Sequence, residues 1–96
     1  MVLSFFKHLL PTAAAQSLEV FPGDTLDITL SGSDSDGPSD LTYAVNDSML
    51  IGTLTGGSNS WTYTPAGGFE GADSFTFTVN DGLADSEPAT VSIAVT

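Results

Sequence analysis

The stretch "WTYTPAGGFEGADSFTFTVNDG", residues 61–82, alternates apolar and polar side chains on both sides of a turn. Trp61 and Tyr63 precede the turn, Phe75 and Phe77 follow it, and threonines occupy intervening positions. A period of two is typical of a half-buried β-strand, because successive side chains point to opposite faces. The proline- and glycine-rich segment between them favours a loop. The stretch therefore predicts two strands that turn their aromatic residues towards a core and their threonines towards solvent.

The same alternation recurs along the chain after Pro11, where no long helical pattern is found. Segments rich in glycine, proline, asparagine and aspartate separate the alternating sets and indicate turns. Short strands at this spacing predict an all-β fold, a seven-stranded antiparallel immunoglobulin-like β-sandwich. The expected strands lie around residues 18–20, 25–30, 41–45, 51–54, 61–64, 75–79 and 91–95.

The charge of the chain excludes several classes of partner. Its 96 residues, 41% of them hydrophobic, suffice for one domain with a modest core. Twelve acidic residues against the single Lys7 give a net charge of -11, so phosphate backbones and anionic lipids would be repelled. We therefore expect neither nucleic-acid binding nor membrane insertion. The chain has no cysteine for a disulfide or a thiol nucleophile, and its charge suits a calcium-rich exterior.

Antiparallel strands alternate in direction, so every second loop lies at the same end of a sandwich. The acidic loop "SGSDSDGPSD", residues 31–40, should therefore share one pole with the loop of residues 80–88. A second group of acids should gather at the opposite pole. The first group comprises Asp34, Asp36, Asp40, Asp81 and Asp85, and the second Asp24, Asp47, Glu70 and Asp73.

Residues 61–82, with "GSDSDGPSDLTYAV" (residues 32–45) before them, resemble the bacterial cadherin-like and immunoglobulin-like tandem repeats of surface adhesins and secreted multidomain proteins. The motifs that carry the resemblance are aromatic-Thr-Tyr-Thr-Pro, Phe-x-Gly-x-Asp-Ser-Phe and Val-Asn-Asp-Gly. The resemblance implies a cadherin-like sandwich that acts as a non-catalytic spacer or adhesion repeat outside the cell or on its surface. It implies neighbouring repeat domains, other cell-surface proteins or polysaccharides as partners.

The resemblance also implies a calcium site. Animal cadherins, which these repeats resemble more distantly, bind calcium through an Asp-x-Asp after the second strand and an aspartate near the end of the sixth. Those positions match Asp34, Asp36 and Asp81, and the glutamate of a further cadherin motif falls on Glu70. The strand-A glutamate of that pattern is replaced by Pro22-Gly23.

The residues allow two interpretations of the acidic loop. Calcium takes six to eight oxygen ligands, and residues two apart in an extended chain point to one side, so Asp34 and Asp36 could both face Asp81. Alternatively, these carboxylates solvate the loop and cap its turns by hydrogen bonds to the backbone. The loop is not an EF-hand, because its twelfth position is Val45 and not glutamate.

Other candidate sites carry less weight. Trp61, Tyr63 and Tyr43 could form a platform for sugar rings, but two of them share one strand face, which favours the core. No Gly-x-Ser-x-Gly motif occurs and the glutamates are scattered, so we do not expect an enzyme. The alternative to a spacer is a carbohydrate- or protein-binding module of a secreted multidomain protein.

The first residues, "MVLSFFKHLL", differ from the rest. They are too few to span a bilayer, and a signal peptide would carry a positive charge before its apolar run. We expect residues 1–12 to form a leader, disordered or shortly helical, and residues 13–96 to form the sandwich domain. The apolar spacing of the leader would let it dock on a neighbouring molecule.

Overall fold

The computed structural model describes residues 10–34, 41–82 and 84–96, and their regular structure is entirely β. The leader up to residue 9 and the acidic loop of residues 35–40 lie outside the described residues. The strands are β1 (Thr12–Ala13), β2 (Gln16–Val20), β3 (Leu26–Thr29), β4 (Gly32–Ser33), β5 (Thr42–Asn46), β6 (Thr53–Gly57), β7 (Ser60–Thr64), β8 (Gly71–Asn80) and β9 (Ala89–Val95).

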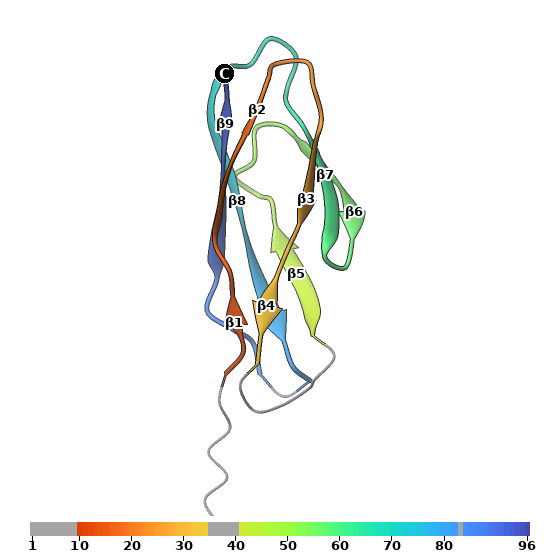
Figure 1. Cartoon of the computed structure of the whole chain (residues 1–96), viewed down its shortest axis with the longest axis vertical. Coiled ribbons are helices and arrows are strands. Elements are labelled where there is room, and N and C mark those ends of the chain that lie inside the picture. Colours follow the sequence, from red (N-terminus) through yellow and green to blue (C-terminus); the bar gives the residue numbers. More distant parts are fainter. Residues whose placement is uncertain (1–9, 35–40, 83) are drawn as a thin grey trace, which may run out of the picture.

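Two sheets face each other in the sandwich (Figure 1). One sheet has the strand order β2-β9-β8-β5 and the other the order β3-β7-β6, while β1 pairs with β4. The seven predicted strands are all present, and the predicted immunoglobulin-like sandwich is confirmed. The short strands β1 and β4 are additions, and β1 begins at Thr12, one residue before the predicted start of the domain.

One strand pair departs from a purely antiparallel arrangement. Strand β2 runs parallel to β9, with Gln16 opposite Val91 and Val20 opposite Val95. The first and last of seven alternating strands run in the same direction, so they are parallel where the fold places them side by side. The main-chain N–H of Thr96 continues this pairing by donating to the carbonyl of Val20 at 3.1 Å.

The core lies between the sheets and is built from the alternating inward positions. Tyr63, Phe75 and Phe77 are buried, as predicted, and Phe77 lies opposite Val45 on β5. Trp61 is only partly buried: it packs against the edge of the core, and its indole N–H donates to the carbonyl of Ser58 at 2.9 Å. The buried apolar residues are Val20, Ile28, Leu30, Leu54, Tyr63, Phe75, Phe77, Val79, Ala89, Val91, Ile93 and Val95.

The ends of β8 define the two poles of the sandwich. At one end β8 leads into Asp81, and Gly32 lies so close to Val79 that a Cβ added to Gly32 would come within 2.9 Å of Val79 Cγ1. At the other end Gly71 pairs with Val95 beside the end of the chain (Figure 1). We call these ends the Asp81 pole and the C-terminal pole.

Candidate functional site

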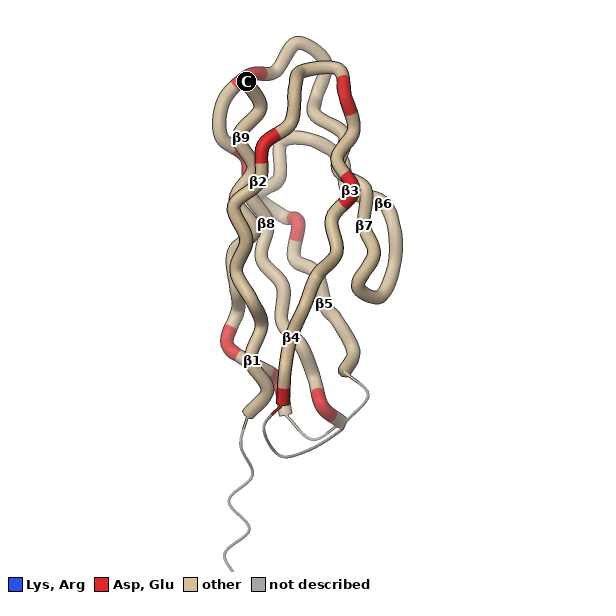
Figure 2. The backbone as a smooth tube through the Cα atoms, viewed as in Figure 1, with Lys and Arg blue, Asp and Glu red and all other residues tan. Residues whose placement is uncertain are grey.

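Two of the four predicted calcium ligands lie at the Asp81 pole. Asp34 directly follows β4 and Asp81 directly follows β8, and both are partly buried. Figure 2 shows acidic positions at this pole and others along the molecule, without a basic residue in the part drawn in colour. Asp36 lies outside the described residues, so its place relative to Asp34 and Asp81 stays a prediction.

The structure gives Asp81 a role in its own turn. Its carboxylate oxygen Oδ1 accepts a hydrogen bond from the main-chain N–H of Ala84 at 2.9 Å, and its own N–H donates to the carbonyl of Ala84 at 3.3 Å. Beside it, the side-chain oxygen of Asn80 accepts from the N–H of Gly82, and its amide donates to Asp85 Oδ1 at 2.8 Å. This is the backbone capping that the sequence offered as the alternative to metal binding.

Glu70 lies at the opposite pole, as its place in the sequence predicted. It precedes the first residue of β8, whereas Asp81 follows the last, and the strand is ten residues long. Glu70 and Asp81 are eleven residues apart in the sequence, which at about 3.3 Å per residue is roughly 36 Å. One ion therefore cannot bind both residues. Among residues 10–34, 41–82 and 84–96, no group of three or more histidine, cysteine, aspartate or glutamate side chains is placed to hold a metal.

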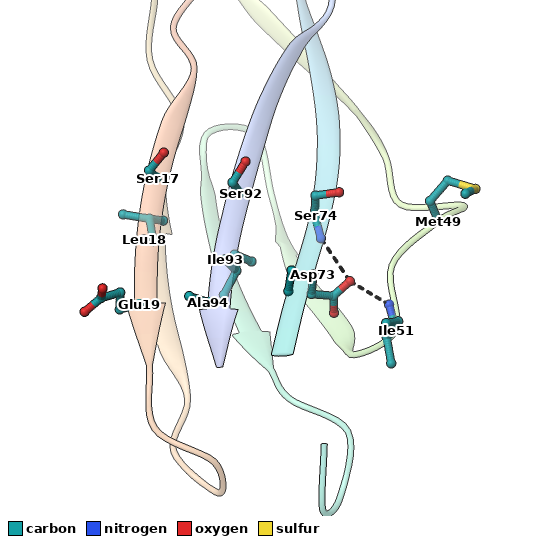
Figure 3. A pocket seen from close by; sticks show the side chains of 11 residues that line it. Ser17, Leu18, Glu19, Met49, Ile51, Asp73, Ser74, Ser92, Ile93 and Ala94 are labelled. Carbon is teal, nitrogen blue, oxygen red and sulfur yellow. Dashed lines mark hydrogen bonds between the residues drawn. The ribbon is translucent and has the colours of Figure 1, made fainter. Parts of the chain in front are cut away.

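A further carboxylate, which the sequence places only among the acids of one pole, is buried and held by several hydrogen bonds. Asp73, in β8, is 5% exposed and accepts four hydrogen bonds. Its Oδ1 accepts from the N–H groups of Ile51 and Ser74, both at 2.9 Å (Figure 3). Its Oδ2 accepts from the N–H of Gly52 at 2.8 Å and from the hydroxyl of Tyr63 at 2.6 Å. The carboxylate thus fastens the loop between β5 and β6 to β8 and β7.

These contacts shift the pKa values of both titratable groups, Asp73 and Tyr63. Burial alone would raise the pKa of Asp73, but the hydrogen bond from Tyr63 and those from three backbone N–H groups outweigh it and lower that pKa. Burial, followed by the hydrogen bond to Asp73 and its negative charge, raises the pKa of the Tyr63 hydroxyl well above its usual range. The pair is therefore an ionised carboxylate held by a neutral phenol over the neutral pH range.

The sequence did contain a signal for this pair. Period two places Asp73 on the same face of β8 as Phe75 and Phe77, where a charged side chain needs several hydrogen bonds to remain buried. The sequence places Asp73 among the acids of one pole, and the structure adds that Asp73 is buried whereas Asp24, Asp47 and Glu70 are exposed. The partners of Asp73 come from a turn and from another strand, which alternation does not reveal.

An open groove of about 800 Å³ lies over the four-stranded sheet, beside this fastened loop. Small side chains of three neighbouring strands form its floor, with Ser17 opposite Ser92 on β9, and Ser92 opposite Ser74 on β8. Glu19 and Met49 stand on opposite sides (Figure 3).

The aromatic platform for sugar rings is not formed as a flat exposed surface. Tyr63 is buried, Trp61 and Tyr43 are partly buried against the core, and the Tyr43 ring lies 6.3 Å from that of Phe77.

No helix in the described ranges has the length and apolar character needed to cross a membrane.

Comparisons with known proteins agree with the architecture. The chain is similar to a nucleoside hydrolase-related hypothetical protein from Saccharophagus degradans that is associated with carbohydrate metabolism, with a TM-score of 0.75 and 18% identity. It is also similar to a putative alpha-galactosidase from Bacteroides fragilis, with a TM-score of 0.67 and 12% identity. The two matches cover 93% and 100% of this chain but only 26% and 19% of those longer chains. At such identities the likeness shows the fold alone.

No curated protein matches the chain. A family model does: the model of the bacterial Ig domain matches residues 9–94, which is most of the sequence. The immunoglobulin-like part of the resemblance is thereby confirmed. The strand order, the sandwich core and this match together show that the chain belongs to the bacterial Ig domain family.

Proposed function

We propose that the chain is a non-catalytic spacer module of a multidomain protein at the bacterial surface or outside the cell. The observation that carries the proposal is the position of the two ends. Strand β1 enters beside β4 near the Asp81 pole, and β9 ends at the C-terminal pole (Figure 1). Modules that a chain enters at one pole and leaves at the other add their lengths when they follow one another.

The comparisons support a role as one unit of a larger protein. Similar domains make up about a quarter and a fifth of two longer bacterial chains, one described as associated with carbohydrate metabolism and the other as a putative alpha-galactosidase. Domains of this family are typically structural and non-catalytic. The buried titratable pair Asp73 and Tyr63 also serves the fold, since its hydrogen bonds hold the backbone of Ile51 and Gly52.

Calcium at the Asp81 pole is the second part of the proposal. Asp34 follows β4 and Asp81 follows β8 at this pole, and Asp36 is two residues after Asp34 in the sequence. Their oxygens are ligands that calcium prefers, but three carboxylates leave several of its six to eight positions to water or to a neighbouring module. We therefore expect weak binding by the single chain and stronger binding at a junction between two modules.

Small-angle X-ray scattering on one, two and three copies of the chain joined end to end would test the spacer role. We expect the maximum dimension to rise by a constant increment per copy, and to rise further or become better defined with calcium. Copies that fold back on one another, so that the dimension hardly grows, would contradict the proposal. A matched array with Asp34→Asn and Asp36→Asn separates the calcium effect from the spacer effect.

A further inference from the structure

The groove over the four-stranded sheet presents apolar side chains that the fold has not buried. Met49 is 82% exposed and Ile51 is 54% exposed, and both line the groove beside the outer face of β8 and β9. Small floor residues such as Ala94 and Ser92 would let another chain approach the sheet closely. Exposed apolar residues that adjoin one another mark candidate binding surfaces more strongly than scattered ones do.

The exposure of Met49 and Ile51 is enforced by the structure. The N–H of Leu50 donates to the carbonyl of Asp47 at 3.0 Å, which closes the turn that carries Met49. The N–H of Ile51 donates to the buried carboxylate of Asp73, so this part of the loop is fastened to β8. The two apolar side chains are therefore held at the side of the groove and cannot fold into the core.

Charge restricts what can occupy the groove. Every charged side chain in the described ranges is acidic, and the exposed Glu19 stands at the groove itself (Figures 2 and 3). An occupant must therefore present apolar side chains to Met49 and Ile51 and a neutral or positive charge to Glu19. A second copy of the sandwich domain fails on this count, because it would bring another strongly acidic surface.

One segment of this chain has both properties. Residues 1–9, "MVLSFFKHL", carry the only lysine and the only histidine of the sequence together with five apolar residues after Met1. We propose that residues 1–9 bind the groove of their own chain, with their apolar side chains against Met49 and Ile51 and Lys7 near Glu19. The groove would then be the docking site of an apolar, cationic segment, which goes beyond the spacer function.

The lengths are compatible with binding within one chain. Ser17, which lies on the floor of the groove, is seven residues after Leu10, and this length of chain spans at most about 25 Å when extended. Nine extended residues span about 30 Å, so residues 1–9 can turn back and reach the same level of the sheet.

Because the sequence has no cysteine, one introduced cysteine can carry a label at a single known position. A nitroxide spin label attached to a single Ser4→Cys substitution broadens the NMR signals of nearby amides in the full-length chain. We expect broadening at Ser92 and Ala94 in the groove, and none at Thr55 and Thr62 on the outer face of the other sheet. Uniform broadening over both sheets, or none at the groove, would overturn the proposal.

Two variants and one matched control identify the contacts. Met49→Ser with Ile51→Ser should lower the ratio of docked to free segment about tenfold, since it removes two apolar contacts. Phe21→Ser is the control, because Phe21 is 70% exposed but does not line the groove. Lys7→Gln should weaken docking a few-fold and reduce the dependence of docking on salt, without changing the stability of the folded sandwich.

A mixing experiment distinguishes the chain's own segment from that of a neighbour. Spin-labelled chain without isotopes is mixed with isotope-labelled chain without the spin label. No broadening in the mixture supports docking within one chain. Broadening at Ser92 and Ala94 in the mixture would assign the groove to a neighbouring copy and overturn the proposal, as would equal docking in the Met49→Ser, Ile51→Ser variant.

Discussion

A single carboxylate connects three parts of this domain. Asp73 accepts hydrogen bonds from the loop between β5 and β6, from Tyr63 on β7 and from its own strand, and it does so while 5% exposed. Such a buried ion is stable only while its donors remain in place. Its value lies in the position that it gives to the backbone of Ile51 and Gly52, whose N–H groups both donate to it.

We expect Asp73→Asn to lower the free energy of unfolding by about 2–4 kcal/mol. The substitution keeps the shape but removes the charge, and it turns an NH₂ group towards donors that need an acceptor. Urea unfolding of the variant against the parent measures the loss. Asp85→Asn is the matched control, since Asp85 is exposed and pairs with Asn80 at the surface. A loss below 1 kcal/mol would show that the network is dispensable.

The same pair predicts how stability depends on pH. Because the pKa of Asp73 is lowered in the folded state, its contribution is present above the unfolded value of about 4 and is lost as the pH falls through the folded pKa. Because the pKa of Tyr63 is raised, stability should fall as the pH rises above about 10. Unfolding measured from pH 2 to 11 checks both limits. Asp73→Asn should flatten the acid limb and Tyr63→Phe the alkaline one.

At the scale of elements, the sequence predicted what depends on alternation and missed what depends on contacts between distant residues. Period two was sufficient to place the strands and to turn Phe75 and Phe77 inward. It could not show that β1 and β2 would join different sheets, because neighbouring strands are chosen by packing and not by local pattern. For the same reason the hydrogen bonds of Asp73 were hidden, whereas the turn formed by Asp81 follows from the local preferences of aspartate and glycine.

Strand β8 supplies the sharpest test of the predicted faces. Phe77→Ala should lower the free energy of unfolding by about 3–5 kcal/mol, because it leaves a cavity at a fully buried position. Thr78→Ala, one residue further on the outer face, should change it by less than about 0.5 kcal/mol. Thermal or urea unfolding compares the two. Similar losses at both positions would mean that the faces of β8 are not distinguished as the structure indicates.

The whole molecule carries its acids without a basic side chain among the described residues to offset them. Such a surface attracts any divalent cation, so a specific calcium site has to be separated from general screening. The discriminating feature is geometry, because calcium accepts irregular sets of oxygen ligands while magnesium demands a near-octahedral shell and releases its waters reluctantly.

Calcium should therefore stabilise the single chain weakly and magnesium less. At ten times a millimolar-range dissociation constant, the expected gain is about 1.4 kcal/mol. The measurement is a melting-temperature titration with each ion, on the parent and on an Asp34→Asn, Asp36→Asn double mutant. Equal shifts with both ions, or a calcium shift that survives the double mutation, would reduce the effect to screening of an acidic surface.

The parallel pairing of β2 with β9 matters when the molecule is pulled by its ends. Force applied between the poles would draw β2 and β9 past each other lengthwise, so their hydrogen bonds from Gln16 to Val20 would resist together. When the two strands of a hairpin are pulled apart at the end opposite the turn, by contrast, the hydrogen bonds between them break one after another. Single-molecule pulling should show a distinct rupture force. Leu18→Pro distorts β2 and should lower this force, and an unchanged force in the variant would contradict the prediction. A module built in this way transmits tension as a tether that yields abruptly, at a threshold, instead of stretching gradually.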